Sequence, residues 1–127
     1  EGVVGHIGDS RAYRFGPTGV FRLTEDHSWV AERLKEGVLT RTEAERHPYR
    51  NVLTRALGLP EARFDLVEVR LAPGEGGLLV TDGLYGHVPE EEWRLGRDLQ
   101  ASLEAMVAEA LRRGGDDNVT AVALRVE

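Results

Sequence analysis

The sequence predicts an α+β domain, mainly an antiparallel β-sandwich flanked by helices. Three observations lead to this prediction. Short apolar runs bounded by turn residues recur along the 127-residue chain, a helical pair interrupts them, and a longer amphipathic segment precedes the last run. Helices do not alternate regularly with strands, as a doubly wound parallel sheet would require, so antiparallel pairing is favoured.

The first part of the chain reads as strands separated by turns. An apolar run at residues 3–7, a turn at 8–10 and an alternating run at 11–15 together predict a hairpin. Gly16-Pro17-Thr18-Gly19 has turn chemistry, and a short strand over 20–23 follows it.

The hydrophobic period changes at Ser28, where helices begin. Residues 29–34 suit a short helix that Gly37 ends. Thr40-Arg41-Thr42-Glu43 is a capping-box signature, which predicts a second helix that stops before Pro48.

The second half alternates between strands and helices. Residues 98–113 form the clearest element, an amphipathic helix that Asp98 can cap and Gly114 can close. The other expected elements are a strand or extended segment at 52–57, strands at 64–71, 77–81 and 119–126, and a short helix at 89–93.

Composition indicates one soluble globular domain. The chain is 41% hydrophobic and 30% charged, which is too apolar for a disordered tail. No run approaches the roughly 20 apolar residues of a membrane span, and no signal peptide is visible, so a cytoplasmic location is the default expectation. The net charge of −6 argues against a nucleic-acid surface. The absence of cysteine excludes disulfides and thiolate chemistry.

Three acidic loop tips are the candidate functional feature. Asp9, Asp82 and Asp117 each lie where an apolar run stops or is about to start. Carboxylate oxygens are the ligands that magnesium and manganese prefer, and one edge of a sheet can gather residues that are distant in sequence. Asp-Gly and Gly-Asp are also common turn pairs, so a purely structural role for each aspartate stays open.

Five segments follow one another along the chain in a recognisable order. They are Val4-Gly5-His6-Ile7-Gly8-Asp9-Ser10-Arg11-Ala12-Tyr13, Leu23-Thr24-Glu25-Asp26-His27-Ser28, the stretch 47–58, Leu78-Leu79-Val80-Thr81-Asp82-Gly83-Leu84 and Gly115-Asp116-Asp117-Asn118-Val119-Thr120. Together they resemble the metal-dependent type 2C (PPM) serine/threonine protein phosphatases, especially the bacterial branch. The resemblance covers essentially all of residues 1–127, but only the carboxyl-terminal half of the family's domain.

This resemblance implies hydrolysis of phosphoserine and phosphothreonine in proteins, with water held between two manganese or magnesium ions as the nucleophile. Asp82 and Asp117 would be ligands of one core metal, and Asp9 would help Asp82 hold a third, weaker metal. Asn118 would orient Asp117, and Arg11 would buttress its loop. Ordinary turn and surface roles for Asn118 and Arg11 stay equally open.

The family's amino-terminal motifs, which supply a bridging aspartate and a phosphate-binding arginine, do not occur in this sequence. We therefore expect the chain to be a fragment or truncation. The alternative to an enzyme is a non-catalytic module that binds a partner or a metal. By the same resemblance, residues 29–58 would form the flap that contacts substrates. Gly86 departs from the family pattern, because many members carry an acidic residue at this position. Unpaired strands would associate with a second copy or with the missing segment.

Overall fold

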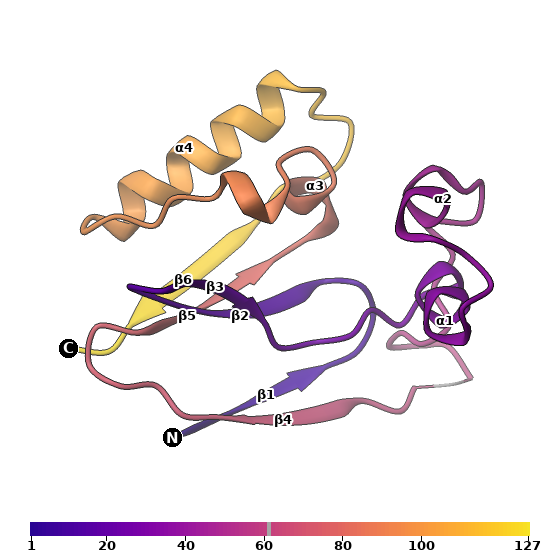
Figure 1. Cartoon of the computed structure of the whole chain (residues 1–127), viewed down its shortest axis with the longest axis horizontal. Coiled ribbons are helices and arrows are strands. Elements are labelled where there is room, and N and C mark those ends of the chain that lie inside the picture. Colours follow the sequence, from indigo (N-terminus) through magenta and orange to yellow (C-terminus); the bar gives the residue numbers. More distant parts are fainter. Residues whose placement is uncertain (61) are drawn as a thin grey trace.

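The computed structural model describes residues 1–60 and 62–127, and within them the strands form two antiparallel sheets (Figure 1). One sheet pairs β1 (Gly2–His6) with β4 (Asp65–Val69). The other has the order β3-β2-β5-β6, with β3 (Gly19–Arg22), β2 (Arg11–Gly16), β5 (Gly76–Val80) and β6 (Ala121–Arg125). The two layers and their flanking helices confirm the predicted antiparallel α+β sandwich.

The core lies between the four-stranded sheet and the helices that cover one of its faces (Figure 1). These helices are α3 (Asp82–Tyr85), the single 3₁₀ turn η1 (Glu90–Glu92) and α4 (Leu99–Arg112). Alternate strand residues point to this face because side chains alternate along a strand. The buried cluster comprises Tyr13, Phe15, Leu78, Val80, Leu84, Val88, Trp93, Met106 and Ala110.

The opposite face of the same sheet is exposed over β5 and β6, whereas Ala12 of β2, which lies opposite Leu79 on that face, is buried. Leu79 pairs with Val122 across β5 and β6, and Leu124 lies two residues further along the same face. The exposed fractions of these side chains are 51%, 56% and 57%. Because these neighbouring apolar side chains are exposed, this part of the sheet face is not covered by other elements among the described residues.

Helices α1 (Trp29–Glu36) and α2 (Arg41–Arg46) lie together at one end of the sheets (Figure 1). Ser28 caps α1 by accepting a hydrogen bond from the backbone of Ala31, and Gly37 ends it with φ 79°. Both bonds of the predicted Thr40–Glu43 capping box are present. None of the described helices has the length and apolar character needed to cross a membrane.

The hairpin predicted from residues 3–15 is wrong. Strand β1 pairs with β4, whereas β2 pairs with β3 and β5, so the turn at Gly8 leads from one sheet into the other. Gly8 has φ 105°, a conformation that glycine adopts readily, and this redirects the chain between the sheets.

Other predicted boundaries differ locally. Residues 52–57 form no strand and contribute one isolated bridge, between Leu53 and Ser28. Asp98 caps α4 as predicted, but the left-handed glycine after the helix is Gly115, with φ 62°, rather than Gly114. The short helix α3 was not predicted, because four residues are too few to show a helical period.

Candidate metal centre

Strand register brings the three predicted aspartates to one edge of the four-stranded sheet. Arg11 lies opposite Val80, and Val80 lies opposite Ala121. Asp9 therefore precedes β2, Asp82 follows β5 and Asp117 precedes β6 along a single line across three neighbouring strands. In an antiparallel sheet, this edge collects the start of one strand, the end of the next and the start of the third.

The electrostatics of this edge favour a cation. Burial, together with the charges of Asp9 and Asp117, raises the pKa of Asp82 to about 6. Burial also raises the pKa of Asp9, with a contribution from Asp26. Mutually repelling carboxylates supply the hard oxygen donors that Mn²⁺ and Mg²⁺ prefer, so the residues fit such an ion.

The aspartates nevertheless form an open arrangement. Within the described part of the chain, the trio whose potential ligand atoms all lie within 4.8 Å of one another is His6, His27 and Asp65, and not the three predicted aspartates. Enclosing an ion at the predicted set would therefore require further oxygen ligands besides these three side chains.

A close approach of two backbones holds Asp82 beside the Asp117 loop. A Cβ atom on Gly83 would lie 2.0 Å from the carbonyl oxygen of Asn118, so only glycine fits there. The hydroxyl of Thr81 donates to the same oxygen at 3.3 Å and accepts from the backbone of Thr120 at 3.1 Å. The segment after β5 and the segment before β6 are thereby joined beside the site.

Neighbouring residues of the second loop point to different partners. Asp116 accepts a hydrogen bond from the His87 ring at 2.8 Å, which lowers the pKa of Asp116. Asp117 contributes to the raised pKa of Asp82 and accepts from the backbone nitrogen of Asn118 at 2.7 Å. Asn118 thus contacts Asp117 through its own main chain, and its predicted orienting role stays a prediction.

Arg11 is committed to contacts within the protein. Its guanidinium group makes two hydrogen bonds to Asp26, at 3.0 and 2.7 Å, and lies 3.6 Å from the ring centroid of Tyr85. Tyr85 in turn donates its hydroxyl to the carbonyl oxygen of Asp9 at 2.6 Å. Arg11 therefore stands beneath the Asp9 loop, in a position suited to the predicted buttressing role.

The sequence reading missed the grouping of His6, His27 and Asp65. Nδ1 of His27 accepts from the backbone of Gly8 at 3.0 Å, so Nε2 of the neutral ring carries the proton and donates to Asp65 at 2.8 Å. A metal at Nε2 would require removal of that proton, so this trio is a hydrogen-bond network. No motif spacing could have revealed it, because its members come from three separate segments.

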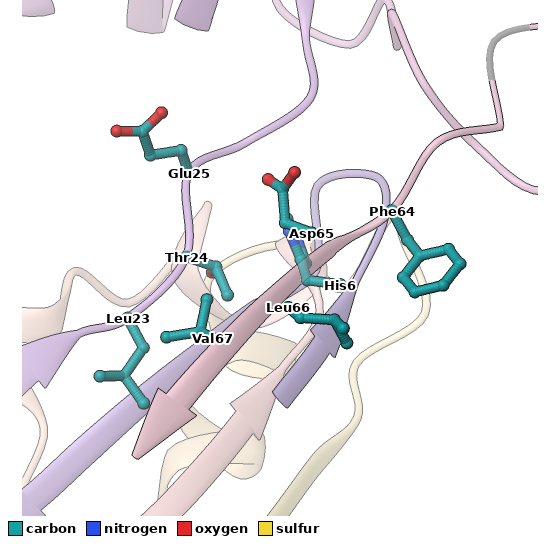
Figure 2. A pocket seen from close by; sticks show the side chains of 8 residues that line it. All are labelled: His6, Leu23, Thr24, Glu25, Phe64, Asp65, Leu66 and Val67. Carbon is teal, nitrogen blue, oxygen red and sulfur yellow. The ribbon is translucent and has the colours of Figure 1, made fainter. Parts of the chain in front are cut away.

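The network borders a cavity of about 460 Å³ between β4 and the segment that follows β3. Figure 2 shows Asp65 and His6 on neighbouring strands at this cavity. Its lining residues are His6, Leu23, Thr24, Glu25, Phe64, Asp65, Leu66 and Val67.

Comparison with known proteins shows that the chain is similar to bacterial phosphatases. The sequence is 36% identical over 123 residues to serine/threonine phosphatase Stp of Listeria welshimeri, covering 93% of this chain and 49% of that protein. It is 38% identical over 125 residues to protein phosphatase PhpP of Streptococcus pneumoniae, covering 94% of this chain and 51% of that protein. No protein-family profile matches the chain.

Solved structures agree with the sequence relatives. The serine/threonine phosphatase of S. agalactiae superposes with a TM-score of 0.90 at 31% identity, covering 98% of this chain and 54% of that one. The catalytic domain of PstP in complex with two manganese ions gives a TM-score of 0.78 at 32% identity, covering 100% of this chain and 55% of that one.

These similarities define a PPM-type serine/threonine phosphatase fold. The chain belongs to the bacterial PPM phosphatase family and spans about half the length of the curated relatives named above.

Proposed function

We propose that the whole protein carrying this chain hydrolyses phosphoserine and phosphothreonine in other proteins, using divalent metal ions at the Asp9, Asp82 and Asp117 edge. The observation that supports this most directly is the alignment of three aspartates across β2, β5 and β6. A set of hard oxygen donors in a field that raises the pKa of Asp82 suits Mn²⁺ or Mg²⁺.

Asp82 and Asp117 hold one core metal in this proposal, and Asp9 joins Asp82 at a third, weaker ion. Two core metals, when bound, neutralise phosphate charge and lower the pKa of the attacking water. Arg11 and Tyr85 fix the main chain at Asp9, while Gly83 permits the approach of Asp82 to the Asp117 loop.

We further propose that residues 29–58 form the flap that contacts the phosphoprotein substrate. They contain α1 and α2, which lie apart from the core at one end of the sheets (Figure 1). A role in cytoplasmic signalling accords with the relatives being serine/threonine phosphatases.

The test is hydrolysis of a phosphothreonine peptide by the whole protein, with Mn²⁺ or Mg²⁺ supplied separately. Asp82→Asn and Asp117→Asn should each lower kcat/KM by about 100-fold or more, since loss of a ligand costs at least as much as loss of a residue that supports one. Asp98→Asn is the matched control, because Asp98 caps α4 through a side-chain oxygen that asparagine retains.

Turnover that survives both ligand substitutions would refute the assigned site. A whole protein that binds Mn²⁺ without hydrolysing the peptide would instead favour the non-catalytic alternative. Unequal activity with the two ions would identify the preferred metal.

A further inference from the structure

His27 is a buried residue whose polar atoms are all engaged. Its side chain is 3% exposed. Its backbone nitrogen donates to the carbonyl oxygen of Gly8 at 2.8 Å, and its own carbonyl accepts from Thr54 at 2.9 Å. The ring contacts Gly8 through Nδ1 and Asp65 through Nε2. His27 therefore joins the turn before Asp9 to β4 and to the segment around Thr54.

His27 holds Gly8 through two hydrogen bonds, one at each backbone polar group of Gly8. Gly8 donates its amide to the ring of His27 at 3.0 Å and accepts the backbone amide of the same residue at 2.8 Å. Gly8 also has φ 105°, so this turn needs its hydrogen-bonding groups fixed to keep one shape. Asp9 is the next residue, so the two hydrogen bonds to Gly8 fix the position of the Asp9 backbone.

Asp65 selects the tautomer of the His27 ring that can accept the hydrogen bond from Gly8. Because Asp65 accepts a hydrogen bond from the Nε2–H group at 2.8 Å, Nδ1 keeps the lone pair that accepts from the Gly8 amide. Arg55 contacts the other carboxylate oxygen of Asp65 at 3.3 Å and also donates to the carbonyl of Arg63 at 3.0 Å. The carboxylate that orients the ring is thus itself held.

A second histidine holds the far side of the same turn. Nε2 of His6 donates to the carbonyl oxygen of Ser10 at 2.7 Å. The residues on both sides of Asp9 are therefore hydrogen-bonded to buried imidazoles, whereas the Asp9 carbonyl receives the hydroxyl of Tyr85. The turn that carries Asp9 is thus fixed by side chains that come from a different sheet and from a separate loop.

We propose that His27, oriented by Asp65, is a positioning residue that fixes the Gly8–Asp9 turn and thereby sets the metal affinity of the site containing Asp9. This inference rests on the proposed function only in taking Asp9 as a metal ligand. His27 touches neither metal nor substrate and acts through the Gly8 peptide.

The test uses the whole protein and titrates Mn²⁺ by calorimetry. His27→Leu removes the acceptor for the Gly8 amide and should weaken the Asp9-dependent binding step by about tenfold or more, as loss of a supporting partner does at other metal sites. His27→Asn should restore binding to within about threefold, because its side-chain oxygen lies where Nδ1 lies in histidine. Asp9→Asn identifies which binding step depends on Asp9.

Met106→Ala is the control for general destabilisation. Met106 is buried on α4, away from the turn, and its loss opens a cavity in the core. It should lower the thermal midpoint without changing Mn²⁺ affinity. Equal losses of affinity in the leucine and asparagine variants, no loss in either, or a matching loss in Met106→Ala would each overturn the inference.

Two further measurements keep the inference separate from the proposed function. Nitrogen NMR of the unmodified, metal-free protein should find Nε2 of His27 protonated and Nδ1 unprotonated; the reverse assignment would overturn the inference even if the leucine variant fails to fold. If the protein binds no Mn²⁺, the proposed function fails, and hydrogen exchange decides the inference. Exchange of the Gly8 amide should then be about tenfold faster in His27→Leu than in His27→Asn, and equal rates would overturn it.

Discussion

Replacing Gly83 with alanine tests whether the close approach of two backbones builds the metal edge. The new Cβ would lie 2.0 Å from the carbonyl oxygen of Asn118, 2.9 Å from its carbonyl carbon and 3.3 Å from a methyl group of Val119. The first two atoms belong to the main chain, so no side-chain rotation relieves the overlap. The loop must retreat by about 1 Å to restore even a tight contact, and it carries Asp117 with it.

Two opposing terms decide the effect on stability. Alanine gains up to about 1 kcal/mol over glycine inside a helix. Overpacking of a close contact costs about 1 to 3 kcal/mol, and an overlap with main-chain atoms belongs at the upper end. We therefore expect a net loss of about 1 to 2 kcal/mol in the free energy of unfolding. Activity should fall further, by about 100-fold, since a displacement of this size separates the ligands.

The assay compares urea unfolding of the metal-free whole protein with kcat/KM for a phosphothreonine peptide at saturating Mn²⁺. Gly77→Ala is the matched control, because a Cβ at this β5 position meets its nearest neighbours, Leu124 and Tyr13, at 4.0 Å. Stability and activity in Gly83→Ala that equal those of Gly77→Ala would refute the reasoning.

Three further predictions concern charge and exposed surface. Because the folded-state pKa of Asp82 is raised from 3.8 to about 6, the contribution of Asp82 to the stability of the metal-free protein should become more favourable as pH falls from about 7 toward 4. Asp82→Asn should accordingly stabilise the metal-free protein at neutral pH by about 1 kcal/mol, after allowance for solvent screening. The same substitution should abolish stabilisation by Mn²⁺. Urea unfolding of both proteins at about pH 7 and about pH 4 measures the free energies. Arg11→Lys should cost about 2 kcal/mol by losing the two-pronged contact with Asp26, and a double-mutant cycle with Asp26→Asn should return a favourable coupling. The isolated chain should self-associate through the face that includes Val122 and Leu124, and it should show negligible turnover; light scattering that finds a stable monomer at micromolar concentration would contradict the first expectation.

The sequence predicts elements well where the signal is local. Thr40 and Asp98 cap the helices that their side chains were expected to cap. Ser28, where the hydrophobic period changes, is the N-cap of α1. Alternation places Leu78 and Val80 in the core as a strand pattern requires. These features depend on residues two to four positions apart, so a single segment contains all the information needed.

Long-range features were harder to predict. The hairpin reading failed because strand pairing of residues 3–7 depends on β4, about sixty residues away. The partners of His27 were equally invisible, since Gly8 and Asp65 lie on opposite sides of it in sequence. The aspartates could be nominated from their strand-end context, but only the register of β2, β5 and β6 brings them to one edge. Their ligand roles remain predictions.

The central position of β5 restricts how this chain can change in length. An inserted residue there would turn Leu78 or Val80 away from the core and shift Asp82 by about 3.3 Å relative to its neighbours. One insertion would therefore damage folding and the proposed chemistry together, with no intermediate that keeps either. Length variation in descendants of this sequence should accumulate instead between α1 and β4, where added residues alter neither register nor the aspartate edge.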